Sequence, residues 1–155
     1  MKAKAYVFLL AVLCCSAIAQ AQTKPVFDAA LAKKLGADDY GMRQYVMAFL
    51  KPGPTKLTDK AAITKLQNAH LQNIERLAKE GKLAVAGPFT DDKGIEGIFI
   101  FNVKTVEEAK ALTETDPGIK AGVFEMELHP FYCSAALMEV TAIHEKIQKK
   151  GITDR

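Results

Sequence analysis

A histidine lies on the apolar face of the longest amphipathic helix that the sequence predicts. Capping signals place this helix from Thr58 or Asp59 to Gly81. At about 100° per residue, His70 falls in the middle of the apolar stripe, which consists of Ile63, Leu66, Ile74 and Leu77. If a carboxylate fixed the tautomer of this imidazole, the second ring nitrogen would be free for general acid or base chemistry. The alternative is a hydrogen-bonded core histidine.

A carboxylate, Asp116, lies at the end of a second predicted helix. The capping box of residues 105–108 opens that helix. The residue before a proline is pushed out of the α region, so Asp116-Pro117 ends it. Asp116 is therefore either a functional acid or only the cap of the turn at Pro117-Gly118.

Small residues elsewhere also allow two interpretations. Gly87-Pro88 either lets a ligand approach the backbone closely or forms a rigid exit from a strand. Beside Asp116, three small residues either line a pocket or let the chain turn, namely Gly118, Ala121 and Gly122.

The remaining polar groups give weaker signals. Glu125, Glu127 and His129 alternate along one strand face, where we expect them to be solvated, and His144 lies on the flank of the last helix. No spacing resembles a ligand motif, so we expect no metal and no cofactor. Cys133 follows apolar residues and is expected to be buried.

The elements that must position these residues follow the order strand, helix, strand, strand, helix, strand. The strands are expected at 43–50, 83–86, 97–103 and 123–129, and the helices at 58–81 and 105–115. This is the βαββαβ order of a ferredoxin-like α+β domain with an antiparallel sheet. Helices cover one sheet face only. The other face is partly apolar, which favours a homodimer formed through the sheet. An extra C-terminal helix is expected at 135–150.

The first 21 residues have the pattern of a secretory signal peptide, with lysines, an apolar run and A-x-A cleavage sites. The run is too short for a membrane span. Its removal leaves 134 residues and lowers the formal charge from +3 to +1. A nearly neutral chain gives no electrostatic basis for nucleic-acid binding. We therefore expect a periplasmic or secreted protein whose mature chain does not span a membrane.

Several short motifs, in order and spacing, carry a family resemblance. They are His70, Glu80-Gly81-Lys82-Leu83, Ala86-Gly87-Pro88, Asp116-Pro117, Ala121-Gly122-Val123 and Pro130-Phe131. Together they resemble the YCII-related (YciI-like) family over about 40–132. The resemblance implies a ferredoxin-like fold that assembles as a dimeric α/β barrel. It also implies an active site in which a histidine pairs with an aspartate, and these fall on His70 and Asp116. The N-terminal arm at 22–39 and the C-terminal helical extension at 133–155 lie outside the part of the chain that resembles the family.

Two functions remain open from the sequence. The first is a cofactor-independent lyase or isomerase acting on a small organic molecule, with His70 as general base or acid and Asp116 orienting it. The residues expected to bind the molecule are Tyr45, Gly87, Pro88, Phe99 and Gly122. The second is a non-catalytic ligand-binding or assembly module of the cell envelope, which the signal peptide and the added helices favour.

Overall fold

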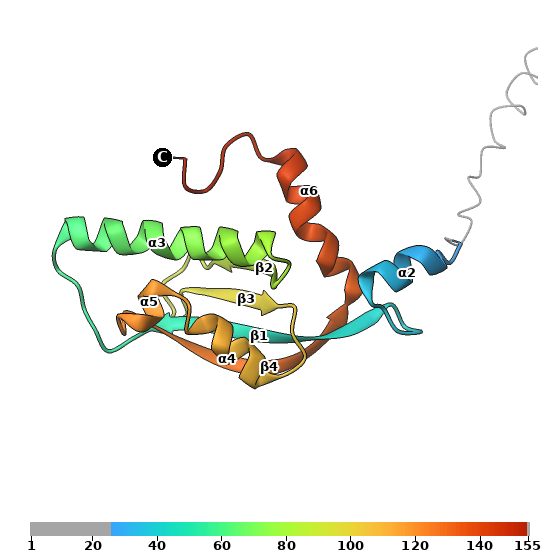
Figure 1. Ribbon diagram of the computed structural model, residues 1–155. Helices are drawn as coiled ribbons and strands as arrows, with labels where there is room; N and C mark the ends of the chain where they lie inside the picture. The colour runs from blue at the N-terminus through green and yellow to red at the C-terminus, as the bar shows by residue number, and fades with distance from the viewer. Residues whose placement is uncertain (1–25, 155) are drawn as a thin grey trace, which may run out of the picture.

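The computed structural model describes residues 26–154 and shows an α+β fold built on one four-stranded antiparallel sheet (Figure 1). The strands are β1 (Met42–Pro52), β2 (Leu83–Pro88), β3 (Gly97–Phe101) and β4 (Phe124–Ser134), in the spatial order β2-β3-β1-β4. The helices are α2 (Ala29–Leu35), α3 (Lys60–Lys79), α4 (Val106–Thr113), α5 (Pro117–Lys120) and α6 (Val140–Ile147), with a 3-10 turn, η1 (Ala135–Glu139). The predicted ferredoxin-like element order is confirmed. The predicted signal peptide lies outside the described residues.

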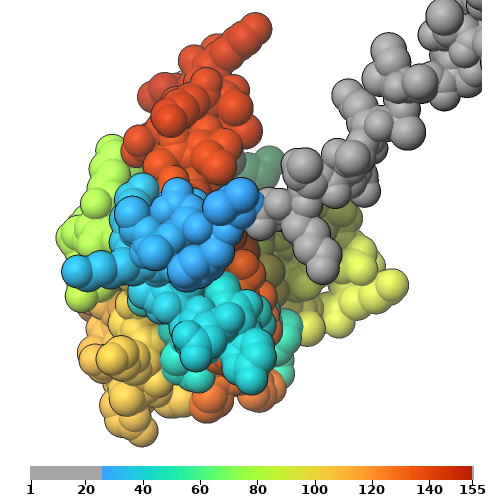
Figure 2. Space-filling view, turned by 90° about the vertical axis from the view of Figure 1, so that its right-hand side faces the viewer, coloured from blue at the N-terminus to red at the C-terminus, as the bar shows by residue number. Residues whose placement is uncertain are grey.

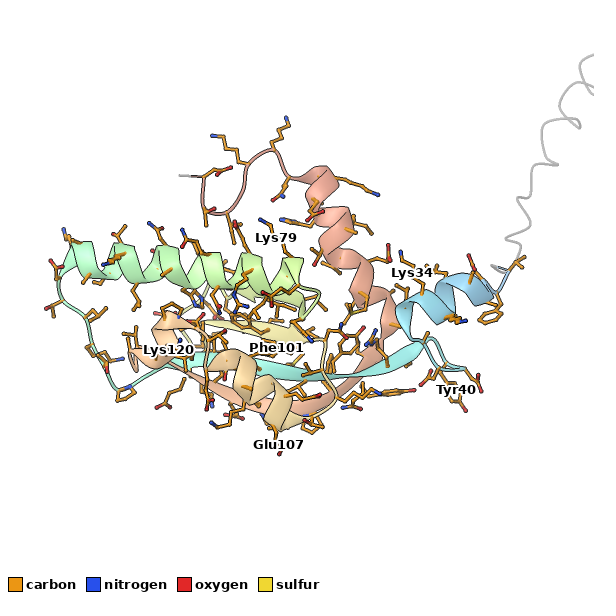
Figure 3. The ribbon with its side chains drawn as sticks, viewed as in Figure 1. Lys34, Tyr40, Lys79, Phe101, Glu107 and Lys120 are labelled. Carbon is orange, nitrogen blue, oxygen red and sulfur yellow. The ribbon has the colours of Figure 1, made fainter. Side chains whose placement is uncertain are left out.

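The main core lies between the sheet and the helices α3 and α4. Alternate residues of β1 point to this side, so Val46, Ala48 and Leu50 are buried there. Leu77 of α3 and Phe101 of β3 complete the centre, and Phe101 is marked among the side chains in Figure 3. Burial of these apolar side chains is the dominant force that fixes α3 against the sheet.

Capping residues in the sequence explain where the helices α3 and α4 begin. The side chain of Asp59 accepts a hydrogen bond from the N–H of Ala62 and caps α3, as predicted. At the start of α4, Thr105 and Glu108 form the predicted capping box, in which each side chain bonds the other residue's backbone N–H. These caps satisfy N–H groups that have no partner inside a helix.

Three elements differ most from the prediction. β4 was expected to end before Pro130 but continues through it to Ser134. β4 is an edge strand, where a residue without an N–H is tolerated. The last helix was expected to span residues 135–150, but it starts as the 3-10 turn η1 and ends at Ile147. The single turn α5 was not predicted, because four residues are too few to show a helical period.

The sheet face opposite the helices is covered only at one end. There Leu137 and Met138 of η1 pack on Tyr45, Ala84 and Ile100. An ion pair between Lys34 and Glu139 joins α2 to η1, and Figure 2 shows α2, in blue, beside the orange-red C-terminal segment. Cys133, expected to be buried, is half-buried beside this cluster. No helix among the described residues has the length and apolar character to cross a membrane.

Candidate active site around His70 and Asp116

His70 lies where α3 meets the sheet, and it is the first buried residue of that helix. The residue is 7% exposed, and its ring packs near two aromatic rings, with centroid distances of 6.1 Å to Phe99 and 5.1 Å to Phe124. The predicted apolar face of α3 is buried only from His70 onward. Ile63 is 41% exposed, because the first half of α3 extends past the sheet (Figure 1).

Asp116 is completely buried and is the N-cap of α5. Its Oδ1 accepts hydrogen bonds from the backbone N–H groups of Gly118 (2.8 Å) and Ile119 (3.4 Å). Aspartate is favoured at an N-cap, and Pro117 at the first helical position loses no hydrogen bond. A Cβ on Gly118 would lie 2.4 Å from Phe124, so only glycine fits at this position. The cap function expected as an alternative is therefore present.

The same carboxylate also bonds His70. Nδ1 of His70 lies 2.8 Å from Oδ2 of Asp116, and the side-chain amide of Asn73 donates to the same oxygen at 3.2 Å. Burial raises the pKa of the Asp116 carboxyl, but the hydrogen bond and charge of His70, the Gly118 N–H and the Asn73 amide outweigh burial. The pKa of Asp116 therefore lies below its usual value, and the group is a carboxylate at neutral pH.

An ionised carboxylate can only accept hydrogen bonds, so in the neutral ring the proton resides on Nδ1. Nε2 is then the unprotonated nitrogen. Nε2 makes no hydrogen bond with another described residue. Within residues 26–154, only Nε of Arg43 is a fully buried side-chain polar atom without a hydrogen-bond partner. Since Nε2 of His70 also has no partner, it is not fully buried. The geometry thus gives His70 a fixed tautomer and an unprotonated nitrogen that is not completely buried.

A second layer of polar groups holds Asn73 in place. Its Oδ1 accepts from Arg76 at 2.8 Å and from Thr115 at 3.1 Å, which fixes its amide nitrogen toward Asp116. Arg76 in turn pairs with Glu80. Asn73 was not among the predicted site residues. The signal was its position three residues after His70, which places both on one helix face.

The structure brings some of the other predicted site residues to His70 and leaves others elsewhere. Phe99 is beside the ring. Tyr45 lies on the opposite sheet face, fully buried, with its hydroxyl donating to the carbonyl of Ser134 at 3.0 Å. Gly122 has φ +67°, and its carbonyl accepts from the N–H of Thr55, so it positions the segment after β1.

Gly87 and Pro88 form the end of β2. Ala86 packs on the helix-side core, so alternation turns Gly87 toward the other face. Pro88 is exposed. By the same alternation Pro88 lies on the helix side. Within residues 26–154 no hydrogen bond or ring contact joins either residue to His70, so their role in binding stays a prediction.

Other polar groups remain apart from the pair. His129 bonds Glu127 at 2.8 Å on the open sheet face, where Lys51 also pairs with Glu127. His144 lines a groove between α3, β2 and α6, and neither that groove nor a second, shallower hollow on α3 is lined by His70 or Asp116. We place the candidate chemistry at the pair, because a buried carboxylate holds the imidazole there, whereas no side-chain hydrogen bond within residues 26–154 orients the ring of His144.

Comparisons with known proteins place the fold in a family. No curated protein matches the chain. A solved structure that it resembles is 5-chloro-2-hydroxyhydroquinone dehydrochlorinase (TftG) from Burkholderia phenoliruptrix AC1100, in complex with 2,5-dihydroxybenzoquinone. The identity is 26%, the match covers 57% of this chain and 93% of that chain, and the TM-score is 0.39. The profile of the YCII-related domain matches residues 44–131, more than half of the chain. The resemblance seen in the sequence is thus confirmed, and the chain belongs to the YCII-related domain family.

Proposed function

We propose that the protein is a cofactor-independent acid/base enzyme, a lyase or isomerase, that acts on a small organic molecule. The observation that carries the proposal is the 2.8 Å contact between Nδ1 of His70 and the buried carboxylate of Asp116. In this arrangement Asp116 orients the ring and His70 transfers the proton. A positioned base of this kind contributes about 10²–10⁴-fold to a rate.

The reaction would proceed in two proton transfers. Nε2 of His70 removes a proton from a C–H or O–H group of the substrate, and the substrate keeps the electron pair. The resulting imidazolium is stabilised by the negative charge of Asp116, which is not itself protonated. The imidazolium then returns the proton to a leaving group, which gives elimination, or to another substrate atom, which gives isomerisation.

The surroundings favour a substrate with an apolar part. Phe99 and Phe124 flank the ring of His70, and both belong to or pack against the apolar core. Such walls bind apolar or ring-shaped groups and lower the local dielectric constant, which strengthens the electrostatic effect of Asp116.

Solvent-deuterium exchange tests the proposal without a known substrate. The protein in D2O is incubated with a panel of ring-bearing ketones and keto acids, and loss of C–H signals is followed by proton NMR. We expect exchange at least tenfold faster than with free imidazole for one class of compound. His70→Asn should abolish this exchange, since its amide nitrogen can still donate to Asp116 but Nε2 is gone.

His144→Asn is the matched control, because His144 lies on exposed α6 and is not near Asp116. It should exchange like the unaltered protein. If His70→Asn exchanges as fast as the unaltered protein, His70 is not the base. If no compound in the panel exchanges, the alternative function, a non-catalytic binding or assembly module, is favoured.

We also propose that the protein is exported and works as a homodimer. Export is supported by the sequence of residues 1–21 alone. For the dimer, the support is the open sheet face, where Met47, Phe49 and Ile98 are only half-buried. Light scattering with size exclusion at micromolar concentration should give twice the mass of one chain, and Phe49→Glu should halve it. A monomer for the unaltered protein would contradict the dimer.

A further inference from the structure

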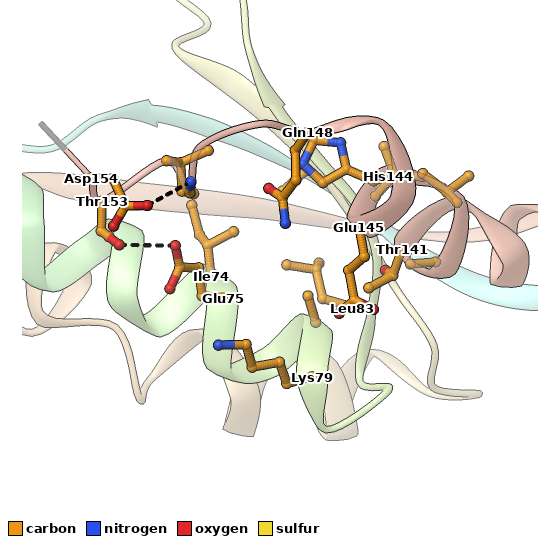
Figure 4. Close-up of a pocket in the computed structure, with 17 residues that line it drawn as sticks. Ile74, Glu75, Lys79, Leu83, Thr141, His144, Glu145, Gln148, Thr153 and Asp154 are labelled. Carbon is orange, nitrogen blue, oxygen red and sulfur yellow. Dashed lines mark hydrogen bonds between the residues drawn. The ribbon is translucent and has the colours of Figure 1, made fainter.

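A groove of about 440 Å³ lies between α3, β2, α6 and the C-terminal tail, away from His70 (Figure 4). One wall comes from α3, which carries Glu75 and Lys79, and the opposite wall comes from α6, which carries His144 and Glu145. The tail closes one end, where the hydroxyl of Thr153 donates to Glu75 at 3.1 Å. Both α6 and the tail lie outside the residues that match the YCII-related domain.

The floor of the groove is the free edge of the sheet. Four consecutive residues of β2, from Leu83 to Ala86, line the groove. The pairing with β3 is irregular between Leu83 and Val85, and Leu83 and Ala86 pack on the helix-side core, whereas Ala84 and Val85 pack on the opposite face. Contact with all four shows that the groove follows the edge of β2. The order β2-β3-β1-β4 leaves that edge without a neighbouring strand.

The backbone groups on this edge are unpaired. β2 pairs with β3, and within residues 26–154 no backbone hydrogen bond joins Leu83–Ala86 to the tail or to α6. An unpaired row of N–H and C=O groups is a template for an added strand. Pro88, which has no N–H, ends the template.

The side chains around the edge define what such a strand would carry. Apolar groups from all three elements reach the groove, including Ile74, Leu83 and Val140. The charged lining residues are three carboxylates and one ammonium, which gives a net charge of −2 when His144 is neutral: Glu75, Glu145, Asp154 and Lys79. In the described part of the chain, neither Glu145 nor Lys79 forms an ion pair. The groove therefore complements an apolar strand with basic side chains.

We propose that this groove binds an extended peptide, which adds as a strand to the free edge of β2. Leu83 and Ala84 are 2% and 4% exposed, so the backbone of the peptide pairs with the half-buried part of the edge at Val85 and Ala86. Its apolar side chains cover the floor, and its basic side chains meet Glu145 and Glu75. The site is separate from His70 and does not depend on the acid/base function. It gives the C-terminal extension a role, because α6 supplies the second wall.

NMR titration tests the proposal directly. The 15N-labelled full chain is titrated with a seven-residue peptide of alternating valine and lysine, with a valine–glutamate peptide as the charge control. We expect the largest amide shifts at Leu83–Ala86 and at least tenfold weaker binding of the control. Glu145→Lys should weaken the lysine peptide at least fivefold, whereas His70→Asn should leave its affinity unchanged.

Two N-methylated forms of the lysine peptide test the backbone pairing. One is methylated at odd residues and the other at even residues, and amides of alternate residues point to opposite sides of a strand. One form should therefore bind at least tenfold more weakly and the other within threefold of the parent. If both forms bind like the parent, or if the amides of Leu83–Ala86 do not shift at 1 mM peptide, the proposal is wrong.

Discussion

Replacing Asp116 by asparagine removes the charge that holds His70 and keeps the shape of the side chain. The oxygen that caps α5 can still accept from Gly118. In place of Oδ2, however, an NH2 group would face the amide of Asn73, which is also a donor, and would force the ring of His70 into its other tautomer. A hydrogen bond to a charged group contributes about 1.5–3 kcal/mol, and a buried donor without a partner costs about 1–3 kcal/mol. We therefore expect Asp116→Asn to lower the free energy of unfolding by about 3 kcal/mol at pH 7.

The loss should depend on pH in a defined direction. The pKa of Asp116 in the folded protein lies below its unfolded value of about 3.9, so its stabilisation is fully present above that value. It is lost as pH falls through the folded pKa. The difference between the unaltered protein and Asp116→Asn should therefore shrink below about pH 4.

Urea unfolding followed by far-UV circular dichroism measures this difference, since the chain has no tryptophan to report by fluorescence. Asp59→Asn is the matched control, because it makes the same chemical change at the exposed cap of α3. It should cost less than about 1 kcal/mol. A loss for Asp116→Asn no greater than for Asp59→Asn, or one of equal size at pH 7 and pH 3, would refute the reasoning.

Two further substitutions test the packing around the site and the assignment of its faces. Gly118→Ala should lower the free energy of unfolding, measured in urea, by about 1–3 kcal/mol, because its Cβ would lie 2.4 Å from a side-chain carbon. Gly87→Ala is the control, since no atom lies within 4 Å of the position of its Cβ. It should change the free energy of unfolding by less than about 0.5 kcal/mol. Tyr45→Phe should cost about 1 kcal/mol through the lost bond to Ser134 and leave any His70-dependent exchange unchanged. A tenfold loss of exchange in Tyr45→Phe would contradict the face assignment.

The two central residues of the site were predictable because each follows a local rule. His70 interrupts an apolar helical stripe, and Asp116 precedes a proline. The two residues are 46 positions apart in the chain, so no local rule predicts that they are in contact. The prediction of this contact came from the family resemblance. Asn73 was missed because a polar residue on a helix is expected to face solvent.

The remaining differences also have physical causes. β1 is largely apolar on both faces, so its pattern did not show that Tyr45 points away from α3. Pro130 was interpreted as the end of a strand, which holds for central strands but not for the edge strand β4. The last helix shows a longer amphipathic pattern than it forms, because its first turn, η1, is held in a 3-10 conformation against the sheet.

The central claim is that Asp116 holds the proton of His70 on Nδ1 and leaves Nε2 free as a base. Long-range 1H–15N NMR correlations of the His70 ring at pH 8 measure this directly, because protonated and unprotonated ring nitrogens have different shifts. We expect the Nδ1–H tautomer in the unaltered protein and the Nε2–H tautomer in Asp116→Asn. The Nε2–H tautomer in the unaltered protein would contradict the account.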